Sequence, residues 1–275
     1  PIDFTQIPNV RFYVVGPVND GIPENSQAGN YWFSATEFPL ANGVKDTVLY
    51  LHNGGILDWT PPVMDEGNAT YLYDPDDPPY TIGGNNMIVE IPQGGRKSQG
   101  QMNLADPNFA PYTMNRADVL QYVSPTLPDT FSIIGFPEFR IWASSNPGEP
   151  GPTDTDFMIR IIDVYPDGRE MFVTEGVVNA RAREYARGII RCMKYPYLPG
   201  CHQDVREDTT APFSNIMAGQ VYEYYFMGLP IAYTFGKGHR IKVLVSSANY
   251  PKYQPNPNIP IEDGEFFRRQ PGDGK

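Results

Sequence analysis

Proline and glycine interrupt this chain too often for long helices. The 275 residues contain 29 prolines and 26 glycines, so about one residue in five breaks or bends the backbone. Proline removes a backbone donor and ends helices, whereas the 18 tyrosines and 15 phenylalanines favour strands. These residues exclude a helical bundle and predict short strands joined by turns.

Runs of β-branched and aromatic residues lie between these turn residues. They fall at 10–15, 47–51, 70–73, 119–123, 131–134, 139–143, 157–164, 171–178, 221–227 and 241–246. Asp167-Gly168, between two of the runs, is typical of a hairpin turn. Helix is expected only for one or two turns at 179–187. The pattern predicts an all-β jelly-roll β-sandwich with long loops and at most short helices, as a single domain over 1–275.

Residues 74–117 lack such runs of β-branched and aromatic residues. They contain proline-rich and glycine-rich stretches, which are typical of loops. Loops this long inside a domain either serve a function or pack on another part of the protein.

The charge balance limits the partners. Asp and Glu number 32 against 21 Lys and Arg, a net charge of −11, which disfavours binding to nucleic acid or to an anionic membrane surface. No apolar run approaches the ~20 residues that span a bilayer. We also find no signal segment at the start of the chain, so any such segment lies outside it.

No nucleophile motif is found in the sequence. No serine stands in a Gly-x-Ser-x-Gly elbow, and the three histidines, His52, His202 and His239, are expected to be surface or packing residues. No His-x-x-x-His or Cys-x-x-Cys motif is present, so we expect no metal and no cofactor.

Several polar and aromatic groups leave alternatives open. Asp154 and Asp156 would face the same side if they share a strand, as a sugar-hydrolysing pair or calcium ligands would, but a solvated strand entry is the commoner arrangement. Trp32, Trp59 and Trp142 are consistent with a free-standing carbohydrate-binding module, although such residues are more often core or interface.

Two cysteines bear on the cellular compartment. Cys192 and Cys201 enclose a Pro/Gly loop and are expected to form a disulfide, which indicates a secreted or periplasmic protein. Two free thiols in a reducing cytosol are the alternative.

Read in order, the motifs resemble a known family. They resemble the C-terminal domain of X-Pro dipeptidyl-peptidases, bacterial cocaine esterase and alpha-amino-acid ester hydrolases. The stretches that carry this resemblance are Tyr73-Asp74-Pro75 with Gly83-Gly84, Arg116-Ala117-Asp118-Val119-Leu120, Asp154-Thr155-Asp156-Phe157, Asp163-Val164-Tyr165-Pro166-Asp167-Gly168, Arg181-Ala182-Arg183, and Gly238-His239-Arg240-Ile241 with Ser246-Ser247-Ala248-Asn249. The match extends over roughly residues 8–260.

The resemblance implies a non-catalytic domain. The family's serine, aspartate and histidine lie in an α/β-hydrolase domain of the same polypeptide, on which this domain would pack and whose substrate pocket it would help to shape. No hydrolytic activity is therefore expected from this chain alone, and homo-oligomerisation stays open. The implied domain-interface or structural positions are Asp74, Arg116, Asp118, Asp154, Asp156, Asp163, His239 and Arg240.

Two stretches depart from the family pattern. Family members continue into a closing strand, whereas residues after about 260 are polar and poor in strand signals, so the last strand is expected to be missing. Residues 184–218 are expected to be a family-specific insertion.

Overall fold

Strands dominate the computed structural model, which describes residues 8–38, 40, 42–64, 66–82, 88–90, 96–98, 102–194 and 213–260. The elements, in chain order, are β1 (Val10–Val14), η2 (Pro23–Gln27), β2 (Tyr31–Ala35), β3 (Tyr50–His52), β4 (Ile56–Asp58), β5 (Ile88–Glu90), β6 (Arg96–Ser98), α1 (Ala110–Thr113), β7 (Leu120–Val123), β8 (Phe131–Gly135), β9 (Glu138–Ala143), β10 (Pro152–Thr153), β11 (Asp156–Val164), β12 (Glu170–Asn179), η5 (Ala180–Ala182), α2 (Arg183–Lys194), β13 (Ile216–Met217), β14 (Tyr222–Met227), β15 (Ile231–Phe235) and β16 (Arg240–Ser246).

The largest sheet contains six strands in the order β12-β11-β16-β7-β4-β3. Its pairs are antiparallel except for β4 and β7, which meet in parallel at Ile56 and Val123. The β11–β12 hairpin closes where Tyr165 N–H donates to the Arg169 carbonyl (2.8 Å), with Gly168 at a φ of 88°. The Asp-Gly hairpin expected from the sequence is confirmed.

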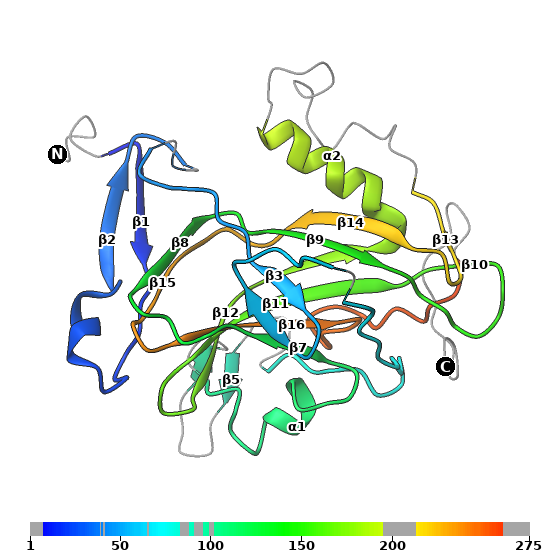
Figure 1. Ribbon diagram of the computed structural model, residues 1–275, viewed down its shortest axis with the longest axis horizontal. Coiled ribbons are helices and arrows are strands. Elements are labelled where there is room, and N and C mark those ends of the chain that lie inside the picture. Colours follow the sequence, from blue (N-terminus) through cyan, green and yellow to red (C-terminus); the bar gives the residue numbers. More distant parts are fainter. Residues whose placement is uncertain are drawn as a thin grey trace.

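Two strand pairs, β8–β15 and β9–β14, lie over one face of this sheet (Figure 1). The main hydrophobic core fills the space between the layers; Phe157, Ile159, Tyr224 and Phe235 belong to it. Along β9, Phe139 faces the core while Trp142 is exposed, as the alternation of that run predicts.

The loop-like segment 102–119, with α1, covers the opposite face of the sheet (Figure 1). There Leu104 and Met114 pack against Ile162 of β11 and Leu244 of β16 in a second hydrophobic cluster. The stretch without strand periodicity is therefore partly a cover for the sheet.

The helix α2 is longer than expected. Only one or two turns were predicted at 179–187, but the helix continues to Lys194 and packs along β14 (Figure 1). Ile190 is buried, and Arg187 reaches Glu223 of β14 at 2.6 Å. Contacts with the sheet thus stabilise a helix whose apolar stripe is thin in the sequence.

The strand predictions were wrong at some positions. Residues 70–73 form no strand; instead Tyr73 is buried, and the hydroxyl of Tyr71 lies 2.8 Å from Ser247 Oγ. Strands β2, β4 and β15 were not predicted. The predicted strand loss after residue 260 lies outside the described residues. No helix in the described ranges is long and apolar enough to span a membrane.

Candidate functional site

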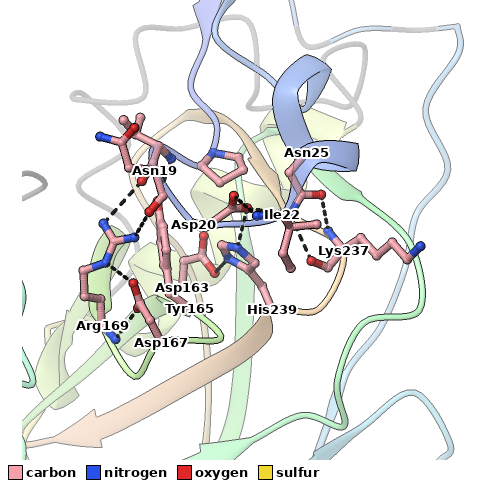
Figure 2. Close-up of polar contacts among 12 residues, drawn as sticks. Asn19, Asp20, Ile22, Asn25, Asp163, Tyr165, Asp167, Arg169, Lys237 and His239 are labelled. Carbon is pink, nitrogen blue, oxygen red and sulfur yellow. Dashed lines mark hydrogen bonds and ion pairs between the residues drawn. The ribbon is translucent and has the colours of Figure 1, made fainter.

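A buried histidine joins segments that are far apart in the sequence (Figure 2). His239, just before β16, has no exposed surface. Its Nδ1 lies 2.8 Å from Asp163 Oδ1 on β11, and its Nε2 lies 3.2 Å from Asp20 Oδ2. The structure thus brings the predicted residues Asp163 and His239 into contact and adds Asp20, which the sequence analysis missed.

Other donors satisfy the two carboxylates. The Tyr233 hydroxyl donates to Asp163 Oδ2 (2.8 Å), and the Ile22 N–H and the Asn25 amide donate to Asp20 (3.0 and 2.6 Å). Since a carboxylate only accepts, both ring nitrogens of His239 are best used as donors, which is the imidazolium form.

The pKa directions agree with this assignment. Burial alone would lower the pKa of His239, but the hydrogen bonds and charges of Asp163 and Asp20 raise it above the usual value. Burial raises the pKa of Asp163, against the opposing effect of His239. Because His239 is buried and both its nitrogens face carboxylates, it cannot accept a proton from a nucleophile. It is a structural cation.

Arg169, in the turn after β11, holds the loop that carries Asp20 (Figure 2). Its guanidinium donates to the carbonyls of Asn19 (2.6 Å) and Val18 (3.3 Å) and to Asp167 Oδ2 (2.8 Å). It also lies 4.4 Å from the centre of the Tyr165 ring. The hairpin turn and the buried histidine therefore fix the same loop.

Arg116 and Asp118, two positions apart in the sequence, form an ion pair. Arg116 Nε and Nη2 contact both oxygens of the buried Asp118 (2.7 and 2.9 Å). The same guanidinium reaches Asp77 Oδ1 and Oδ2 (3.3 and 3.2 Å), and Asp74 Oδ1 accepts from the Asp76 N–H (2.8 Å). Arg116 thereby fastens the Tyr-Asp-Pro loop to the start of β7.

Asp154 and Asp156 share two amide groups. The Nδ2 of Asn179 donates to one oxygen of each carboxylate at 2.8 Å, and the Nδ2 of Asn256 does the same at 2.9 and 3.1 Å. Burial raises the pKa of both carboxyls, that of Asp156 to about 6.

Backbone contacts fix the orientation of the two amides. Asn179 Oδ1 accepts from the Arg181 N–H (3.2 Å), and Asn256 Oδ1 accepts from the Asn258 N–H (2.9 Å), so the amide N–H groups face the carboxylates. The pair is therefore a hydrogen-bonded tie between β11 and the segment at Asn256. In the ranges that the structure describes, no group of three or more His, Cys, Asp or Glu side chains could hold a metal ion.

The other predicted residues are placed separately. Arg240 is exposed and donates to Thr126 Oγ1 (3.2 Å), away from the His239 cluster. Cys192, in α2, is disulfide-bonded, and Cys201 and His202 lie outside the described residues. The pairing of the two cysteines remains a prediction.

His52 lines a surface cavity of about 280 Å³ together with Leu51, Met64 and Tyr122. Its Nδ1 lies 2.7 Å from Glu66 Oε1, and its Nε2 lies 2.9 Å from the Thr60 carbonyl. As with His239, both nitrogens are engaged, so His52 is not a free base.

Two of the three indoles are exposed, and each lies beside an arginine. Trp32 and Trp142 are 60% and 62% exposed, but Arg11 lies 4.9 Å from the centre of the first ring and Arg140 lies 5.1 Å from the second. Trp59 packs against the main core. An exposed row of all three indoles is therefore not formed, because Trp59 packs against the core.

Together, the β layers and the buried polar contacts define a mostly β domain that is held by internal ion pairs and hydrogen bonds. Among the described residues, neither histidine hydrogen-bonds a serine, threonine or cysteine side chain. Residues 3–270 match the family described as the X-Pro dipeptidyl-peptidase C-terminal non-catalytic domain, and this chain belongs to that family.

Individual relatives agree with this family. The chain is 30% identical over 260 residues to the cocaine esterase of Rhodococcus sp. (strain MB1 Bresler), covering 92% of this chain and 36% of the esterase. It is 24% identical over 200 residues to a putative serine esterase of Mycobacterium tuberculosis (strain CDC 1551 / Oshkosh), covering 70% of this chain and 30% of that protein. The chain thus spans about a third of the length of these relatives.

Two solved structures share the fold. An alpha-amino acid ester hydrolase superposes with a TM-score of 0.61 at 22% identity, covering 90% of this chain and 36% of that protein. An aminopeptidase from a marine sediment Thaumarchaeota archaeon superposes with a TM-score of 0.60 at 21% identity, covering 93% of this chain and 35% of that protein.

Proposed function

We propose that this chain is the non-catalytic part of a serine hydrolase that cleaves ester or amide bonds, and that it packs on the α/β-hydrolase domain of the same polypeptide and helps to shape the substrate pocket. The family membership supports this function. The observation that carries it is that both described histidines, His52 and His239, are held by other groups, so neither of them is free to act as the base that a serine alkoxide requires.

The whole protein and the present chain should therefore differ in activity. We expect the whole protein to hydrolyse an activated ester and to be inhibited by a serine-directed phosphonate, while the 275-residue chain alone shows no turnover above buffer. Phosphonate-sensitive turnover by the chain alone would overturn the proposal.

We propose a jelly roll as the finer fold of this single domain. Two layers of mainly antiparallel strands around one core support it. We further propose a secreted or periplasmic location, supported by the disulfide-bonded Cys192, because disulfides persist in oxidising compartments. Localising the tagged whole protein by cell fractionation tests this.

A further inference from the structure

The two-stranded ribbon β1–β2 presents two different faces. Phe12 and Phe33 lie opposite each other on one face, with ring centres 5.4 Å apart. Phe38 contacts Phe12 (5.6 Å) and Phe136 (5.7 Å), and so ties this face to the β8–β9 connection. Because side chains alternate along a strand, Arg11, Tyr13, Trp32 and Ser34 lie on the other face.

This outer face is aromatic and exposed. Tyr13 is 42% and Trp32 60% exposed, and their ring centres lie 5.5 Å apart in an edge-to-face contact. Arg11 stacks on the indole at 4.9 Å. Trp, Tyr and Arg are the residue types that most often carry the binding energy of protein interfaces. The composition therefore fits a protein surface as the partner.

The ribbon is also firmly anchored. The Val15 N–H donates to the Ala232 carbonyl (2.9 Å), and the Thr234 N–H donates to the Val15 carbonyl (2.8 Å). The loop between β1 and β2 is fixed by the Asp20–His239 contact and by Arg169. A surface held in place before binding loses little conformational entropy when it docks.

The family match indicates which partner would cover this face. Since this is a C-terminal domain, the catalytic part precedes β1 in the polypeptide, and about two thirds of the relatives' length lies outside the matched region. We propose that Arg11, Tyr13 and Trp32 form the surface on which the catalytic α/β-hydrolase domain of the same polypeptide docks. This inference rests on the proposed function and adds the residues that make the contact.

Trp142 is a matched control. It is 62% exposed and carries a stacked arginine, Arg140, at 5.1 Å, but it lies on β9 rather than on the ribbon. The photo-cross-linking residue p-benzoylphenylalanine would be placed at position 32 or at position 142 of the whole protein. Irradiation should cross-link position 32, and not position 142, to peptides of the hydrolase domain, as read by mass spectrometry.

Each other outcome overturns a defined part of the proposal. Cross-links from position 142 alone, or from position 32 to a second copy of the protein, would reject this surface but leave domain packing intact. Cross-links to the hydrolase domain from neither position would contradict the proposed packing as well.

Two alanine substitutions give an independent measurement. Trp32→Ala in the whole protein should speed the separation of the two domains during limited proteolysis by about tenfold or more, as expected for loss of an interface anchor. Trp142→Ala should leave that rate unchanged. Equal rates for the two variants would overturn the proposal, since both remove an exposed indole.

Discussion

His239 Nδ1 and Asp163 Oδ1 lie 2.8 Å apart, and neither side chain has any surface exposed to solvent. The contact joins two of the sequence motifs, Asp163 to Gly168 and Gly238 to Ile241, because Asp163 of β11 is the register partner of Ile241 of β16. The same histidine then reaches Asp20 and thereby fixes the loop between β1 and β2. One buried cation thus connects the central sheet to the ribbon.

Removing the charge of Asp163 should be costly. Asp163→Asn leaves an imidazolium buried beside a neutral amide, and breaking a buried ion pair from one side costs about 3–5 kcal/mol. Urea unfolding should show this loss. Arg240→Ala, next to His239 in the sequence but exposed, should change the unfolding free energy by less than about 0.5 kcal/mol. Equal effects of the two variants would reject the structural role of the pair.

The same cluster should make stability depend on pH. The pKa of His239 is raised in the folded state, so its stabilisation is complete below about pH 6.5 and is lost as the pH rises through the folded pKa. The difference in unfolding free energy between the natural chain and His239→Gln should therefore be largest near pH 6 and shrink at higher pH. Asp20, Asp163, Tyr165 and Tyr233 are the titratable groups around His239. A difference that stays constant from pH 6 to pH 9 would contradict this assignment.

Local pattern predicted those parts of the fold that depend on local chemistry. The run at 157–178 has β-branched and aromatic residues on both sides of the Asp-Gly turn, so β11 and β12 were found. Residues 70–73 have the same residue types but form no strand; Tyr71 instead contacts Ser247, a partner 176 positions away that cannot be read from a short window. The site shows the same limit, since nothing in the sequence near Asp20 indicates that His239, 219 positions away, is its partner.

Arg116 should not be replaceable by lysine. Its guanidinium contacts both oxygens of Asp118 and both oxygens of Asp77, a fork geometry that a single ammonium cannot reproduce. We expect Arg116→Lys to cost about 1–3 kcal/mol and to raise hydrogen exchange at 74–82. Arg140→Lys, on an exposed arginine, is the control and should leave exchange in that segment unchanged. Unaltered exchange in both variants would show that the loop is held by other contacts.

Asp156 should destabilise the fold when it is ionised. Burial and the neighbouring Asp154 raise its pKa to about 6. The unfolding free energy should therefore fall as the pH rises from about 4 to above 6, because the unfolded chain ionises this carboxyl more readily than the folded chain does. Asp156→Asn keeps an acceptor oxygen for Asn179 and Asn256 and should stabilise the chain at pH 8, by up to about 3 kcal/mol. At pH 4 the gain should vanish. Glu37→Gln, which removes an exposed carboxylate, is the control for net charge. If Glu37→Gln stabilised the chain as much as Asp156→Asn does, the gain would come from the change in net charge and not from the burial of Asp156.

Arg160 should be dispensable for stability, although it is fully buried. Its Nη2 donates to the Thr113 carbonyl (2.8 Å), but Nε and Nη1 have no hydrogen-bond partner among the residues that the structure describes, and burial lowers its pKa to about 10. The charges of Glu175 and Asp118 oppose this lowering, but both carboxylates are hydrogen-bonded to other groups: Asp118 is bound by Arg116, and Glu175 by Asn249 and Lys252.

Burying a charge whose hydrogen bonds are incomplete costs free energy, and an apolar side chain of similar length avoids that cost. Arg160→Met should therefore unfold at the same urea concentration as the natural chain or at a higher one. Arg160→Ala should lose about 2–4 kcal/mol, because it leaves a cavity between Thr113 and the sheet. A loss in Arg160→Met as large as that in Arg160→Ala would show that the guanidinium charge itself stabilises the fold.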